Sequence, residues 1–178
     1  MDLIERKVHS ETIFDGKIIK VKLDQAELPN GDLAGREIVE HPGGVCVLAL
    51  DGNNHVTMVR QFRYSIQQQL LELPAGKLEY GEDHYAAAVR ELSEETGLEA
   101  EEWTYLGYML PTPGYCTEKI HMYLARNLKQ RKQHLDEDEF LDVLSMPFEA
   151  RVERVMDNTI TDGKTAAAAL KTKVLLGL

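Results

Sequence analysis

Residues 76–98 read GKLEYGEDHYAAAVRELSEETGL, and this stretch decides which fold we expect. A glycine-bounded loop runs into a short helix that carries Glu91, Glu94 and Glu95. In a helix of 3.6 residues per turn, positions i, i+3 and i+4 lie within roughly 100° of one another. The three carboxylates are therefore predicted to share one face of the helix.

A second stripe on the same helix is predicted to pack on the core. Tyr85, Ala88, Val89 and Leu92 recur at i, i+3, i+4 and i+7, the spacing of a helix face that contacts a hydrophobic core. We therefore expect a helix that is anchored along one side and acidic along the next.

The acidic face favours a cation, because like charges at i and i+4 repel each other in a helix. Oxygen ligands suit Mg²⁺ or Mn²⁺, whereas the absence of cysteine nearby, with only His84 in the stretch, argues against zinc. The alternative interpretation is a solvated acidic surface, since exposed helices are rich in glutamate.

The remaining fixed residues of the stretch have simple physical roles. Gly76 and Gly81 permit tight backbone turns, and Gly97 stands where a left-handed C-cap would end the helix. Arg90 can pair with a neighbouring carboxylate.

Counted along the chain, Gly76 is followed by five residues and Glu82, then by seven residues and Arg90-Glu91-Leu92. One residue further come Glu94-Glu95, and one residue after those come Gly97-Leu98. This pattern resembles the Nudix hydrolase signature at every position. The resemblance implies that Glu91, Glu94 and Glu95 bind metal, and that the chain is an α/β (α+β) protein, an α/β/α sandwich with a mixed β-sheet.

The rest of the chain supplies the strands and helices for that fold. The predicted strands are residues 8–14, 17–28 and 36–40 in an N-terminal antiparallel meander, 44–50 and 55–62 in a hairpin, and 103–110 and 120–125. Residues 70–75 lead into the glycine loop, and helices are predicted near 147–156 and 164–176. We divide the chain into residues 1–41, the antiparallel strands, and residues 42–178, the Nudix domain. The resemblance implies that the first region forms a homodimer interface and part of the substrate pocket.

Composition narrows the class of protein. The 178 residues include 30 acidic and 20 basic ones, a formal charge of −10, which disfavours a protein that binds nucleic acid through its phosphates. The sequence shows no apolar run of 18 residues and no export signal, so we expect no membrane association and a cytoplasmic location. Cys46 and Cys116 are expected to be reduced thiols.

Four further segments look like the ADP-ribose pyrophosphatases of bacteria. They are REIVEHPGGV at 36–45, RQFRY at 60–64, LELPAGKLE at 71–79 and LDEDEFLDV at 135–143. Pro113 lies sixteen residues after Gly97, a spacing that in this family marks ADP-ribose hydrolases.

The resemblance extends to single residues outside the helix. It implies that the backbone carbonyl of Ala75 and the carboxylate of Glu139 contact the metal and that Glu137 is the general base, with the roles of Glu137 and Glu139 open to exchange. Taken alone, the acidic loop is also typical of a solvated surface. Guanidinium groups match diphosphate oxygens well, and Arg36, Arg60 and Arg63 stand at strand ends. The resemblance implies catalytic roles for Glu91, Glu95, Arg90 and Glu137, and substrate contacts from Arg36, Arg63, Glu72, Pro113 and Gly114.

The sequence therefore predicts a Mg²⁺-dependent enzyme that hydrolyses ADP-ribose to AMP and ribose 5-phosphate. One alternative is a pyrophosphatase for another nucleoside diphosphate sugar, such as GDP-mannose. The other is a Nudix module that senses ADP-ribose without turning it over, although the complete set of glutamates argues against it.

Overall fold

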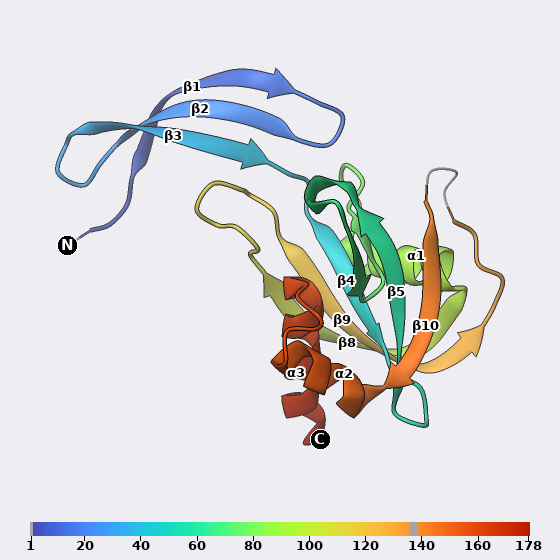
Figure 1. Cartoon of the computed structure of the whole chain (residues 1–178). Helices are drawn as coiled ribbons and strands as arrows, with labels where there is room; N and C mark the ends of the chain where they lie inside the picture. The colour runs from blue at the N-terminus through green and yellow to red at the C-terminus, as the bar shows by residue number, and fades with distance from the viewer. Residues whose placement is uncertain (1, 136–138) are drawn as a thin grey trace. The chain divides into compact units, whose positions relative to one another are not determined.

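The computed structural model describes residues 2–135 and 139–178 (Figure 1). The chain forms two compact units. The first comprises the residues up to Gly43 together with residues 110–119, and the second comprises residues 44–109 and 120–178. The loop at 110–119 thus joins the N-terminal strands, a discontinuity that no local sequence pattern signals.

The first unit is the predicted antiparallel meander. Its strands are β1 (Arg6–Asp15), β2 (Lys20–Glu27) and β3 (Leu33–Glu40), in the order β1-β2-β3 (Figure 1). The loop 110–119 is held to β3 by hydrogen bonds from the Val39 N–H to the Tyr115 carbonyl at 2.7 Å and from the Thr117 N–H to the Val39 carbonyl at 2.9 Å. Strand β1 is exposed along its whole length.

The second unit contains two sheets. One has the order β7-β4-β9-β8, and the other has the order β10-β5-β6. β4 and β9 pair in parallel, whereas the other pairs are antiparallel, so the predicted mixed sheet is confirmed. The strands are β4 (Gly44–Ala49), β5 (His55–Arg63), β6 (Gln68–Glu72), β7 (Ala75–Lys77), β8 (Leu98–Met109), β9 (Ile120–Gln130) and β10 (Leu141–Pro147).

The predicted hairpin of residues 44–50 and 55–62 is wrong, although both strands exist. The turn between them is closed by one antiparallel bridge, Leu50 to Val56, and by a hydrogen bond from the Asp51 N–H to the His55 carbonyl at 2.9 Å, but the two strands pair with different neighbours. β4 is buried at every residue and needs a neighbour on each edge, which β7 and β9 provide, while β5 pairs with β10 and β6. β10 was not predicted as a strand, because most of its residues are exposed and it lacks an apolar period.

Two hydrophobic cores lie on opposite faces of β4. Val45, Val47 and Ala49 pack with α1 (His84–Thr96). Cys46 and Leu48 belong to the core that includes residues of α2 (Phe148–Met156) and α3 (Gly163–Leu176). Because side chains alternate along a strand, this division gives the expected α/β/α sandwich. No helix in the described part of the chain is long and apolar enough to cross a membrane.

Candidate active site

Both ends of α1 are fixed by local interactions, and these set the positions of its glutamates. The Asp83 carboxylate accepts the backbone N–H groups of Tyr85 and Ala86 at 3.0 and 3.1 Å. At the other end Gly97 has φ +69° and donates its N–H to the Ser93 carbonyl, as the sequence predicts. The capping residues therefore define a helix of thirteen residues that includes Glu91, Glu94 and Glu95.

The burial of α1 differs from the prediction in one important respect. Ala88 and Leu92 are buried as expected, but Tyr85 and Val89 are 45% and 38% exposed. Glu91 and Glu95 are instead only 7% and 2% exposed. Ala87, one turn before Glu91, is also fully buried, so the buried face of the helix includes Glu91 and Glu95.

The short strand β7 holds these two carboxylates. The Ala75 N–H donates to Oε2 of Glu95 at 2.9 Å. A Cβ added to Gly76 would lie 1.9 Å from the Glu91 carboxyl group. The missing Cβ of Gly76 is thus required for the close approach of Glu91. The predicted role of Gly76 in a backbone turn is wrong, because this glycine lies inside strand β7. Gly81, at φ +78°, does have the backbone of a glycine turn.

Burial perturbs the acidity of both groups. Desolvation raises the pKa of Glu95 to about 8, and the negative charges of Glu91 and Glu139 add to that increase. Desolvation also raises the pKa of Glu91, with like-charge contributions from Glu94 and Glu139. Glu139, two residues before β10, therefore lies within electrostatic reach of the two buried glutamates. A cation bound among them would relieve this repulsion.

Arg90 is the centre of an ion-pair network on the same helix. It donates to both carboxylate oxygens of Glu82 at 3.0 Å, to Glu91 at 2.9 Å and to Glu94 at 3.0 Å. The predicted pairing of Arg90 with a carboxylate is present. The geometry gives Arg90 the role of neutralising and orienting the acidic face.

The donor set fits a hard divalent cation in its chemistry. All candidate ligands are oxygens. Two of them belong to buried carboxylates, that of Glu91 facing Gly76 and that of Glu95 bound to the Ala75 N–H. Within residues 2–135 and 139–178, no three His, Cys, Asp or Glu side chains are grouped closely enough to hold a metal as they stand. In this arrangement Glu91 and Glu94 each place an oxygen on Arg90.

A third buried carboxylate, that of Glu72 at the end of β6, binds two cations. Arg63 donates to its two oxygens at 2.8 and 2.7 Å, and Lys164 donates to Oε2. Lys164 also pairs with Asp162 at 3.0 Å. Sequence reasoning missed Lys164, because a lysine in the first turn of a helix is ordinarily exposed and carries no signal of burial.

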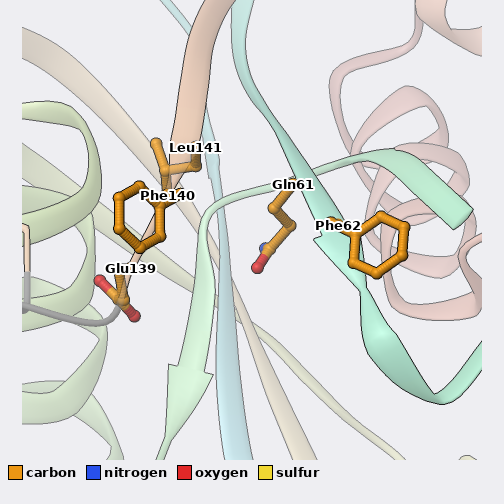
Figure 2. Close-up of a pocket in the computed structure, with 5 residues that line it drawn as sticks. All are labelled: Gln61, Phe62, Glu139, Phe140 and Leu141. Carbon is orange, nitrogen blue, oxygen red and sulfur yellow. The ribbon is translucent and has the colours of Figure 1, made fainter. Parts of the chain in front are cut away.

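A pocket of about 260 Å³ is lined by residues of β5 and by residues at and just before the start of β10 (Figure 2). Gln61 and Phe62 line it from β5, and Glu139, Phe140 and Leu141 line it where β10 begins. Figure 2 shows Glu139 and Phe140 on one side and Gln61 on the other. The pocket therefore places Glu139 at the edge of a cavity large enough for part of a small ligand.

A family model described as the NUDIX domain matches residues 40–164. This protein belongs to the Nudix family. The family resemblance predicted from the sequence is thereby confirmed, and Nudix hydrolases generally depend on divalent metals.

Three individual Nudix comparisons are informative. A methanol dehydrogenase activator from Bacillus methanolicus is 42% identical over 166 residues, which cover 92% of this chain and 90% of that protein. An ADP-ribose pyrophosphatase from Bacillus subtilis (strain 168) is 42% identical over 168 residues, covering 93% and 91%. A solved structure described as an ADP compounds hydrolase has a TM-score of 0.87 at 22% identity, covering 99% of this chain and 97% of its own, and supports the fold.

Four of the predicted Nudix site residues lie outside the described part of the second unit. Arg36, Pro113 and Gly114 belong to the first unit, where Arg36 makes a bidentate ion pair with Glu5 at 2.9 and 2.6 Å. Glu137, the predicted base, lies outside the described residues. The structure therefore brings together Glu72, Ala75, Arg63, Glu139 and the α1 residues Arg90, Glu91, Glu94 and Glu95, all in the second unit.

Proposed function

We propose that this Nudix enzyme hydrolyses the diphosphate of ADP-ribose to AMP and ribose 5-phosphate, with Mg²⁺ or alternatively Mn²⁺ as cofactor. The main support for this proposal is a pair of buried carboxylates, those of Glu91 and Glu95, which lie against Gly76 and Ala75 of β7. The substrate is suggested by the name of the 42% identical Bacillus subtilis relative.

The metal would be held by Glu91, Glu94, Glu95, Glu139 and the Ala75 carbonyl. When bound, such a metal neutralises charge on the diphosphate and lowers the pKa of a water molecule. Arg63 supplies a guanidinium, which matches phosphate oxygens in geometry and charge. Arg36, Pro113 and Gly114 are proposed as further substrate contacts. Glu72, predicted from the sequence as a contact, has a side chain that is 0% exposed, so its proposed part in substrate binding is through Arg63. Arg90 keeps the acidic helix face in place.

Product analysis tests this function. The purified protein is incubated in the presence of Mg²⁺ with one substrate at a time: ADP-ribose, GDP-mannose or another nucleoside diphosphate sugar. The products of each reaction are separated by chromatography. Equal amounts of AMP and ribose 5-phosphate, formed fastest from ADP-ribose, are the expected result. Preference for GDP-mannose would support the alternative enzyme, and binding of ADP-ribose without turnover would support a sensing module.

A second candidate is activation of an alcohol dehydrogenase. It is favoured by the equal, 42%, identity to the protein named methanol dehydrogenase activator. To test this, the rate of methanol oxidation by purified methanol dehydrogenase is measured with and without this protein. A higher rate in its presence would show that this chain also activates the dehydrogenase.

We propose Glu137 as the general base, because its position matches the base of the resembling enzymes. Glu137→Gln is expected to lower kcat by about 10²–10⁴-fold while KM changes little, since a base acts only as water loses its proton. Steady-state kinetics of Glu137→Gln and Glu139→Gln provide the measurement. If kcat falls only in Glu139→Gln, the two roles are exchanged, and if it falls in neither, the base lies elsewhere.

We also propose a homodimer formed through the first unit. Its strands and turns expose large apolar side chains, which two copies would cover: Val8, Ile13, Phe14, Ile18, Leu23 and Leu33. A stable interface of this kind buries roughly 2,000 Å² or more. Light scattering at micromolar concentration is expected to give twice the chain mass of 20.1 kDa, and a value equal to that mass would refute the dimer. The cytoplasmic location stays a prediction.

A further inference from the structure

Glu72 is a fully buried carboxylate that is shared by two cations of very different exposure. Its side chain is 0% exposed, while those of Lys164 and Arg63 are 9% and 39% exposed. Arg63 binds both oxygens of Glu72, and Lys164 binds Oε2. One cation is therefore enclosed with the carboxylate, and the other faces solvent.

Lys164 is held in place by its surroundings. It lies in the first turn of α3, where Asp162 caps the helix by accepting the Thr165 N–H at 3.0 Å. The next residue, Thr165, accepts the Leu73 N–H on its hydroxyl at 2.9 Å and a hydrogen bond from Arg151 on its carbonyl at 3.4 Å. These bonds tie the turn that carries Lys164 to the end of β6, beside Glu72.

Arg63 has the opposite character. It ends β5 and its guanidinium is partly in solvent. Its positive charge offsets a small part of the rise in the pKa of Glu95 on α1, so Arg63 lies within electrostatic reach of the acidic helix face. Of the two cations on Glu72, Arg63 is the one whose guanidinium is accessible to a ligand near the acidic helix face.

A buried carboxylate that loses its only cation is strongly destabilising, so Glu72 must keep one partner at all times. We propose that Lys164 is a positioning residue. It stays paired with the Glu72 carboxylate and neutralises its charge when Arg63 leaves Glu72 to bind a phosphate oxygen of the substrate. This inference rests on the proposed diphosphate hydrolysis. It assigns to Lys164 a role in substrate binding without any contact to the substrate.

Chemical denaturation tests the shared carboxylate without substrate. Urea unfolding midpoints are measured for Arg63→Ala, Lys164→Met and the double variant. Each single variant leaves Glu72 one cation, so the double variant is expected to lose far more than the sum of the two single shifts. Adding Glu72→Gln to the double variant is expected to recover most of that loss. Additive shifts, or no recovery, would overturn the inference.

Kinetics test the release of Arg63. In Lys164→Met, Arg63 is the one remaining cation on Glu72 and is expected to stay there. The substrate then loses a charge-assisted hydrogen bond from Arg63, so KM for ADP-ribose is expected to rise about tenfold or more. The change in kcat is expected to be smaller. Glu72→Gln combined with Lys164→Met frees Arg63 and is expected to bring KM back toward the wild-type value. A merely structural role for Lys164 would give no such recovery.

Lys173→Met is the matched control, because Lys173 lies on the same helix and pairs with the exposed Glu149. Its KM and unfolding midpoint are expected to stay near those of the wild type. An unchanged KM in Lys164→Met would overturn the inference. Absence of ADP-ribose turnover in the wild type would instead overturn the proposed function, and the urea midpoints would still decide whether Glu72 is shared.

Discussion

Glu95→Gln is expected to reduce kcat for diphosphate hydrolysis by roughly 10²-fold or more, the usual cost of removing one preorganised charge from an active site. Glu91→Gln is expected to have a similar effect. The amide keeps the volume of the side chain, and its oxygen can still accept the Ala75 N–H that Glu95 binds at 2.9 Å. The loss therefore belongs to the metal site and not to packing. Steady-state kinetics at saturating Mg²⁺ provide the measurement.

Stability of the same variant gives an independent control. The folded pKa of Glu95, about 8, lies above the ordinary value of 4.5, so the protonated carboxyl stabilises the metal-free fold. That contribution is complete below the ordinary pKa and is lost as pH rises through about 8. In the presence of a chelator, the unfolding midpoint of Glu95→Gln relative to the wild type should therefore rise as the pH increases from 4.5 to about 8.

The control variant is Glu99→Gln, because Glu99 is an exposed residue on β8. This substitution should change neither activity nor stability. Normal turnover in both Glu91→Gln and Glu95→Gln would contradict the metal assignment.

Gly76→Ala is expected to be nearly as damaging, although it adds only a methyl group. The new Cβ would lie 1.9 Å from the Glu91 carboxyl carbon, which is closer than any real contact. Glu91 must then move, and a displacement of about 1 Å at a reacting centre can cost on the order of 10²-fold in rate. The measurement is kcat with ADP-ribose, together with the Mg²⁺ concentration at half-maximal rate, which is expected to increase.

Gly52→Ala is the matched control. Gly52 also lies in the second unit, has no atom within 4 Å of an added Cβ and does not have a positive φ. It should keep full activity. If both alanine variants keep full activity, Glu91 is not required at its present position. If both lose activity equally, the effect of Gly76→Ala comes from the backbone and not from the contact with Glu91.

The residues whose roles depend on near neighbours in the chain were predictable. The helix C-cap at Gly97, the spacing of Glu91, Glu94 and Glu95, and the pairing of Arg90 all involve residues within a few positions of one another. The same holds for the N-terminal meander, whose strands follow directly after one another. Local geometry is encoded in local sequence, which is why the signature also identified the family.

Other features of the fold and of the site depend on residues that lie far apart in the chain, so local sequence patterns do not reveal them. Lys164 meets Glu72 across 92 positions, and β4 pairs in parallel with β9 instead of forming the predicted hairpin with β5. The inward orientation of Glu91 and Glu95 likewise depends on β7, because a helix with apolar and acidic stripes can turn either edge toward the sheet. Gly76 settles that choice, since its missing Cβ leaves the space in which the Glu91 carboxyl group lies. Local sequence thus specifies the acidic helix, whereas packing determines which of its carboxylates are buried, since burial is a property of contacts that the helix does not contain.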